Sequence, residues 1–362
     1  MLGKVKWYSN NHGYGFAKTD EGEEVFLHKD AMVEPVELDE EDIVEFDIEE
    51  DGCKYPRALN IKKAETIEKM PFKVFESSEG NVWKYVFTKD DMVAEAVLYK
   101  YEDFYKRTVI CCSTQSGCRV GCRFCGTGNK FVRNLTTEEI VGQIKAVLKD
   151  KDIENVNSRG LRFQIMFMSM GEPLHNWDNV EEAIRILHKD YPNAELLLST
   201  IAPDEPAAIN KMIKLSQEIE KIGLQFSIHK STDKKRDALI PFNNKLRLEQ
   251  IRDLGLVWWE KTGRHPYLNY CIDGINNTPD DIEKLQTLFS PVVFNFTFSV
   301  VCSPNENMKE AGFKNLEEIR AFEQAFLEKG YNTRVFDPAG QDDIGGGCGQ
   351  LWYVQQWLKE HN

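Results

Sequence analysis

The chain lacks long apolar runs and any excess of positive charge. No stretch of about 20 apolar residues occurs among its 362 residues, so no membrane-spanning helix and no membrane partner are expected. Its N-terminus has no apolar signal region, which predicts a cytoplasmic and not a secreted protein. Lysine and arginine total 45 against 59 acidic residues, and the net charge of −14 argues against binding nucleic acid through an overall positive field.

What the chain does contain suits a globular protein of about two domains, since domains average roughly 150 residues. Hydrophobic residues make up 41% of the sequence, enough for a proper core. The nine cysteines are an odd number, and three of them, Cys118, Cys122 and Cys125, fall within eight residues. Without a signal peptide, this clustering indicates metal binding or redox chemistry and not a framework of disulfides.

Residues 1–63 are predicted to form a small all-β unit. Five short runs with strand character, separated by turn residues, fit a small closed barrel; they lie at 4–8, 14–18, 25–28, 43–48 and 57–61. Alternation along neighbouring strands is expected to bring several aromatic rings together. Those rings either plug the barrel or form a surface on which bases stack.

The segments 3–8, 13–16 and 25–28 resemble the cold-shock domain, with its two RNA-binding motifs in order. The resemblance implies an OB-fold barrel that stacks single-stranded bases on five side chains: Trp7, Tyr14, Phe16, Phe26 and His28. The segment 34–51 is heavily acidic, and it would weaken RNA affinity if it bordered these rings. Residues 64–90 are interpreted as a connector, because Pro71 and a turn signal at 77–81 interrupt them.

Residues 91–362 are predicted to form a second domain, of α/β class. Runs with strand character at 161–168, 195–199, 224–229, 267–272, 294–301 and 333–336 alternate with runs of helical period. Six or seven successive βα units imply a parallel sheet, closed into a full or partial (β/α) barrel. In such folds the chemistry lies at the carboxyl ends of the strands.

Cys118, Cys122 and Cys125 have the spacing C-x3-C-x2-C. Three thiolates are one short of the four that fill a 4Fe–4S cluster, which leaves one iron open to a ligand. A structural metal site is the alternative. With Phe124 before the last cysteine, the run resembles the radical S-adenosylmethionine (SAM) signature. That family uses a 4Fe–4S cluster to cleave SAM into a 5′-deoxyadenosyl radical.

Further motifs resemble the radical SAM adenine methyltransferases of large-subunit ribosomal RNA and tRNA, and their Cfr-type antibiotic-resistance relatives. The matching segments occur in order at 113–118, 133–136, 139–143, 168–174, 198–200, 227–229, 240–243, 273–277, 342–344 and 348–351. The resemblance implies that SAM is bound by Gly171, Glu172, Ser199, Ser227, His229 and Ser303. Ser303 stands before Pro304 where the family has asparagine, and a serine offers no amide.

The same resemblance implies the catalytic residues. One SAM methylates Cys348, a second SAM yields the radical that activates this methyl group, and the resulting carbon radical joins the protein to adenine. Cys111 then resolves the adduct by forming a disulfide with Cys348, and Glu95 is the candidate base for the ring proton. An electron donor such as flavodoxin or ferredoxin is expected, and so is a monomer.

The sequence therefore predicts an RNA methyltransferase acting on a ring carbon of adenosine in rRNA or tRNA, with carbon 2 favoured over carbon 8. A basic stretch at 117–135, which includes Arg119 and Arg133, is a candidate contact to RNA phosphates. Two alternatives stay open at this point. One is a radical SAM enzyme with a non-RNA substrate, and the other is an RNA-binding protein whose cluster is structural.

Overall fold

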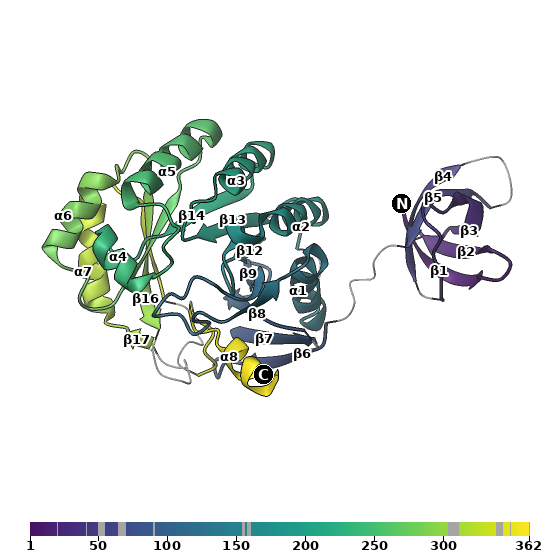
Figure 1. Cartoon of the computed structure of the whole chain (residues 1–362), viewed down its shortest axis with the longest axis horizontal. Coiled ribbons are helices and arrows are strands. Elements are labelled where there is room, and N and C mark those ends of the chain that lie inside the picture. The colour runs from purple at the N-terminus through teal and green to yellow at the C-terminus, as the bar shows by residue number, and fades with distance from the viewer. Residues whose placement is uncertain are drawn as a thin grey trace. The chain divides into compact units, whose positions relative to one another are not determined.

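The computed structural model shows two compact units, Met1–Glu68 and Lys69–Asn362 (Figure 1). The description below covers residues 1–19, 21–40, 42–49, 55–63, 70–89, 91–153, 156–157, 161–302, 311–337, 343–347 and 349–361. Among these residues no helix combines the length and the apolar character that crossing a bilayer requires. The connector predicted over 64–90 is too long, because the second unit begins at Lys69 and residues 72–76 and 82–89 are strands of its sheet.

The first unit is a closed five-stranded barrel, as predicted. Its strands follow the order β1-β2-β3-β5-β4, and their bounds are β1 Leu2–Ser9, β2 Tyr14–Thr19, β3 Glu24–His28, β4 Ile43–Glu49 and β5 Arg57–Lys63. Alternate side chains fill the barrel with an apolar core, which consists of Val5, Ala17, Val25, Leu27, Leu38, Val44, Phe46, Ala58 and Ile61. The barrel therefore has its own core, and none of the five side chains predicted to stack bases belongs to it.

Trp7 reaches the barrel surface through an irregularity of β1. Gly3 and Val5 face the core, so strict alternation would turn Trp7 inward as well. The register between β1 and β2 shifts between Val5 and Trp7, and Trp7 pairs with Phe16. A bulge of this kind inserts one residue and re-aims the next side chain. It places Trp7 outside the barrel, where the ring is 37% exposed.

The second unit is built on an 11-stranded sheet. Its antiparallel part consists of β6 Phe72–Glu76, β7 Val82–Lys89, β8 Met92–Tyr101 and β9 Arg107–Cys112. The parallel part continues from β9 through β12 Arg162–Phe167, β13 Glu195–Thr200, β14 Ile222–Ser227, β15 Tyr267–Ile272, β16 Asn295–Cys302 and β18 Thr333–Phe336. β17 Ala311–Phe313 pairs antiparallel with β16. The described strands form an open sheet, so of the two predicted closures the partial barrel is the one observed.

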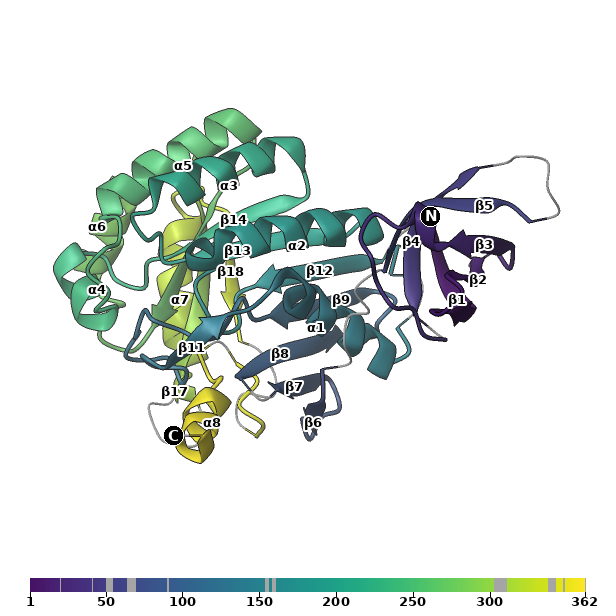
Figure 2. The same cartoon turned by 45° about the vertical axis from the view of Figure 1, so that its right-hand side comes forward.

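Helices follow the parallel strands in the alternation that the sequence predicts. They are α1 Thr137–Asp150, α2 Trp177–Asp190, α3 Pro206–Glu218, α4 Asp233–Leu239, α5 Leu248–Thr262, α6 Pro279–Leu288 and α7 Leu316–Leu327. Figures 1 and 2 show α1, α2, α3 and α5 side by side along one face of the sheet. α1 begins at Thr136, whose hydroxyl accepts the Glu139 N–H while the Glu139 carboxylate accepts the Thr136 N–H. This arrangement leaves the other face of the sheet and the carboxyl ends of the strands for the site.

The chain ends in a segment whose motifs were predicted but whose helix was not. Residues 343–347 and 349–361, here called the C-terminal segment, include α8 Tyr353–His361. α8 packs on β8, in the antiparallel part of the sheet (Figure 1). The Ser78 N–H donates to Asp343 at 2.7 Å, which ties the start of the segment to the β6–β7 turn. Cys348 itself lies outside the described residues, between Gly347 and Gly349.

Candidate active site

The cysteine loop follows β10 Gln115–Gly117, which pairs with β11 Phe131–Asn134. Gly117 has φ +80°, and a Cβ there would lie 2.0 Å from the Lys130 carbonyl oxygen, so only glycine fits. Cys118, Cys122 and Cys125, which follow, line one cavity together with Phe124. The loop thus gathers the predicted ligands in one place.

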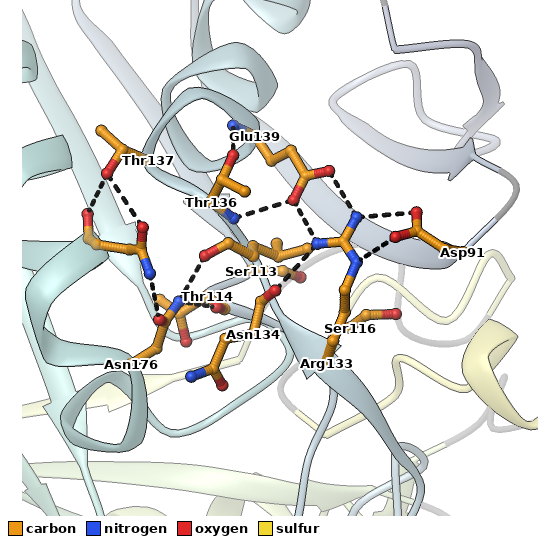
Figure 3. Close-up of polar contacts among 12 residues, drawn as sticks. Asp91, Ser113, Thr114, Ser116, Arg133, Asn134, Thr136, Thr137, Glu139 and Asn176 are labelled. Atoms are coloured by element: carbon orange, nitrogen blue, oxygen red, sulfur yellow. Dashed lines mark hydrogen bonds and ion pairs between the residues drawn. The ribbon is translucent and has the colours of Figure 1, made fainter.

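Arg133 anchors the base of this loop (Figure 3). Its guanidinium donates to both carboxylate oxygens of Asp91, at 2.8 and 3.0 Å, and to both oxygens of Glu139, each at 2.7 Å. Glu139 is also the residue that caps α1 at Thr136. Two carboxylates therefore already neutralise Arg133, which gives it a structural role and disfavours it as the predicted contact to RNA phosphate. Arg119 instead lies over the Phe131 ring, 3.8 Å from its centroid.

The three thiols are hard to deprotonate in the absence of a cation. Burial raises the pKa of Cys118 to about 12, and burial together with the neighbouring thiols raises the pKa of Cys122 well above its usual range. Burial raises the pKa of Cys125 too. Three thiolates at this depth need a cation, and thiolates are the ligands that iron–sulfur clusters take.

Three thiols in one cavity are the donor set that a 4Fe–4S cluster with one open iron takes. Among the described residues, no three His, Cys, Asp or Glu side chains converge closely enough to hold one metal ion. Cys118, Cys122 and Cys125 nevertheless line the same cavity. A 4Fe–4S cluster takes one thiolate per iron and so spreads its ligands farther apart than a single zinc ion does. The donor set therefore fits such a cluster.

Glu172 lines the cavity and is held in place by hydrogen bonds from the protein. Its Oε1 accepts the Thr200 hydroxyl at 2.6 Å and its Oε2 accepts the Ile201 N–H at 2.8 Å. Burial raises its pKa to about 7, against the effect of these hydrogen bonds. The preceding Gly171 has φ +99°, and a Cβ there would lie 2.7 Å from Gln115. The sharp turn that follows β12 thus requires glycine.

Polar residues at the ends of β13 and β14 line the cavity as predicted. Ser199 Oγ lies 3.4 Å from Ser227 Oγ. His229 follows in the left-handed region, with φ +58°, and its ring lies edge-on to Phe124 at 5.0 Å between centroids. Its Nδ1 accepts the Cys271 N–H at 3.2 Å. Burial lowers the pKa of His229 to about 3, so the ring is neutral and carries its proton on Nε2.

Cys111 and Glu95 lie beside the cavity and are not part of its lining. Cys111 pairs in register with Val97 of β8 and with Met166 of β12, which puts it on the face of the sheet that also carries Ser199. Glu95, two residues before Val97, shares this face and is completely buried. Cys112 points to the opposite face, as expected from strand alternation. Both predicted residues are therefore near the site but covered.

Two predicted residues, Ser303 and Cys348, lie outside the described residues. The neighbour of Cys348 is informative, because Gly349 lines the cavity and its carbonyl accepts the Gly126 N–H from the cysteine loop. Sequence reasoning missed other lining residues, among them Thr127, Met168, Ser169, Asn269 and Leu351. Asn269 could have been found as a polar side chain in β15 in register with Ser227.

The barrel of the first unit carries the five predicted aromatic residues on one surface. Ring centroids lie 5.8 Å apart for Trp7 and Phe16, 5.4 Å for Phe16 and Phe26, and 6.2 Å for Phe26 and His28. Tyr14 lies 5.6 Å from Trp7. Tyr55, which the sequence analysis did not single out, adds a sixth ring at 5.2 Å from Phe16. These rings outside the core form a continuous surface suited to stacking bases.

Two families match parts of the chain. Residues 1–64 match the 'Cold-shock' DNA-binding domain, and residues 112–255 match the Radical SAM superfamily. The second match spans the cysteine loop, Glu172 and the strands that carry Ser199 and Ser227. The two matches agree with the two compact units of the structure.

Curated relatives extend the similarity over most of the chain. A probable dual-specificity RNA methyltransferase RlmN of Thermotoga neapolitana is 36% identical over 253 residues, which are 68% of this chain and 68% of that relative. The protein of the same name from Pseudothermotoga lettingae is 32% identical over 311 residues, 84% and 82% of the two chains. Among solved structures, the crystal structure of a radical SAM methyltransferase from Sphaerobacter thermophilus has a TM-score of 0.67 at 28% identity, over 78% of this chain and 81% of that one.

Proposed function

Because the chain belongs to the RlmN-type family of radical SAM RNA methyltransferases, we propose that it methylates a ring carbon of adenosine in rRNA or tRNA, and that this carbon is carbon 2. The enzyme class implies a 4Fe–4S cluster and SAM as cofactors. One observation carries the proposal: the three cluster cysteines, the strand-end polar residues and the residue after Cys348 all line one cavity.

The residues of this cavity divide between the two cofactors. Cys118, Cys122 and Cys125 would hold three irons of the cluster and leave the fourth for SAM. Six residues are proposed to hold SAM: Gly171, Glu172, Ser199, Ser227, His229 and Ser303. Together the bound cofactors supply a methyl group and the one-electron chemistry that an unreactive C–H bond requires. The neutral His229, with its proton on Nε2, would serve as a hydrogen-bond donor.

Two cysteines are proposed to carry and release the methyl carbon. Cys348 receives the methyl group on its sulfur, and this carbon becomes bonded to the adenine ring while still attached to the sulfur. The Cys111 thiolate then attacks the Cys348 sulfur and forms a disulfide; the sulfur–carbon bond breaks, its electron pair stays on the carbon, and a proton completes the methyl group. An external reductant returns both thiols. The contact between Gly126 and Gly349 supports a position of Cys348 next to the cysteine loop.

Glu95 is proposed as the base that removes the ring proton, since replacing hydrogen by methyl must release a proton. Burial raises the pKa of Glu95, and the neighbouring Lys84 opposes this shift. A base must hold its carboxylate ionised until the proton is transferred, so the lysine favours the reactive form. Flavodoxin or ferredoxin is proposed as the electron donor, and the enzyme is proposed to act as a monomer.

The cold-shock unit is proposed to hold single-stranded RNA by stacking. Phe16→Ala combined with Phe26→Ala in the full chain should weaken RNA binding by about 30- to 20,000-fold, because each of the two lost stacked bases contributes roughly 1–3 kcal/mol. The dependence on salt should be shallow, because few cations accompany the rings. Fluorescence anisotropy with a labelled single strand measures both quantities. Affinity equal to that of the unmodified chain would refute stacking, and Phe72→Ala on β6 serves as the aromatic control.

The proposed activity is tested on RNA itself. The anaerobically reconstituted enzyme, with SAM and a reductant, is incubated with unmodified ribosomal RNA and tRNA, and the digested nucleosides are analysed by mass spectrometry. We expect 2-methyladenosine, absent when Cys348→Ala replaces the enzyme. Product at carbon 8 would correct the position only. Cleavage of SAM without any methylated nucleoside would contradict the proposal and favour a non-RNA substrate.

A further inference from the structure

A buried pair of opposite charges lies between the antiparallel strands and the C-terminal segment. Lys84 of β7 and Glu95 of β8 are on the same face of the sheet, with Nζ 3.2 Å from Oε2. Both side chains are 0% exposed. Two charges removed from water are tolerated only when they pair and when hydrogen bonds satisfy their remaining atoms. The residues that hydrogen-bond to Lys84 and Glu95 therefore show which part of the chain the ion pair keeps in place.

The further partners come from the C-terminal segment. The Tyr353 N–H donates to Glu95 Oε1 at 2.9 Å. The Lys84 ammonium lies 3.5 Å from the Gln350 carbonyl oxygen and 5.5 Å from the centroid of the Tyr353 ring. Apart from Glu95, these are the contacts that the described residues offer to Lys84. If the segment moved away, both charged groups would lose their cover and their hydrogen bonds together.

The segment held in this way is the one that carries Cys348. The Gly347 N–H donates to the side chain of Gln350 at 2.7 Å, which ties the residues before and after position 348 to each other. Beyond it, the Leu351 carbonyl accepts the Thr127 hydroxyl from the cysteine loop at 2.8 Å. One short stretch of chain thus touches the Lys84–Glu95 pair on one side and the cysteine loop on the other.

We propose that Lys84 is a positioning residue, whose ammonium holds the carboxylate of Glu95 and the Cys348-bearing segment together, so that one buried contact sets the base and the methyl carrier in place. This inference rests on the proposed function, since it takes Cys348 as the carrier and Glu95 as the base.

Hydrogen exchange of the backbone tests this role in the reconstituted full chain. Lys84→Met should raise the exchange rate of the Tyr353 amide at least about tenfold, because this amide bonds to the carboxylate that Lys84 holds. Lys100→Met is the matched control: it lies on the opposite face of β8, with its ammonium over Trp83, and should leave the Tyr353 amide unchanged. Tm is measured in parallel.

A second variant separates positioning from general stability. In Lys84→Met combined with Glu95→Leu, no charge is left buried, so the Tm should return toward that of the unmodified chain. The Tyr353 amide has lost its acceptor and should still exchange rapidly. Wild-type exchange at Tyr353 in either variant would overturn the proposal, and the double variant alone decides if the single one fails to fold. RNA methylation by the unmodified enzyme is measured separately. A failure of the positioning role of Lys84 and a failure of the proposed function are therefore distinguishable.

Discussion

Cys111→Ala should leave the enzyme covalently joined to its RNA, whereas Cys348→Ala should give neither adduct nor methylated adenosine. In the first variant the carbon is transferred to adenine but no thiolate remains to attack the Cys348 sulfur. In the second the methyl group has no carrier, and turnover should fall by a factor on the order of 10⁴ or more, as when other covalent nucleophiles are removed. Cys111 lies on the face of the sheet that also carries Ser199 and Glu95, and this position supports its role.

Denaturing electrophoresis of labelled RNA after incubation with SAM and reductant measures the adduct, and nucleoside mass spectrometry measures the product. Cys112→Ala is the matched control, because Cys112 is the next residue of β9, points to the opposite face and is buried. It should behave like the unmodified enzyme. Methylation that persists in Cys348→Ala would rule out the carrier mechanism for this protein, and a Cys111→Ala variant that releases its RNA would rule out the resolving role.

Cys122→Ala should abolish the iron–sulfur cluster and with it both SAM cleavage and RNA methylation. Anaerobic reconstitution of the unmodified chain should give one 4Fe–4S cluster, held by three thiolates whose burial and mutual repulsion are relieved by the irons. With Cys122 removed, two thiolates remain, which is too few to retain the cluster. Iron content and the electron paramagnetic resonance signal after reduction measure the loss.

Cys112→Ala again provides the control for this experiment and should retain full iron. SAM cleavage, followed as 5′-deoxyadenosine formation, provides a second readout that does not depend on RNA. An unmodified chain that takes up no iron would contradict the cluster assignment altogether. A Cys122→Ala variant that keeps a stable cluster would instead show that another residue replaces this ligand.

Local patterns predicted most of the elements that position the site. Alternating strands and helices gave the parallel part of the sheet, because side-chain periods of 2 and 3.6 are visible in the sequence itself. The segment 64–90 was misread, since Pro71 and the turn at 77–81 interrupt it, yet β6 and β7 pair across that turn and extend the sheet. Strand alternation predicts that Trp7 lies with the other aromatic rings. Trp7 does lie there, but a bulge in β1, and not alternation, turns its side chain to that surface.

Arg133 shows a different limit of sequence reasoning. A basic stretch without acidic residues predicted an RNA contact, because the sequence shows only neighbours along the chain. Asp91 lies 42 residues away and still reaches the guanidinium (Figure 3). A charge run cannot indicate whether the fold brings distant carboxylates to it. Only the tertiary structure decides whether such a residue is available to a ligand.

By itself, the sequence determined the chemistry of the cysteine loop. Cys118, Cys122 and Cys125 are separated by so few residues that the covalent chain keeps their thiols together in almost any fold, so their spacing indicates metal binding, and the resemblance to the radical SAM signature indicates a 4Fe–4S cluster. The contact between Glu95 and Tyr353 joins residues 258 positions apart. No local spacing specifies that distance; it results from the packing of the C-terminal segment on β7 and β8. The tertiary structure alone therefore decided that the candidate base, its lysine partner and the cysteine-bearing segment share one buried contact.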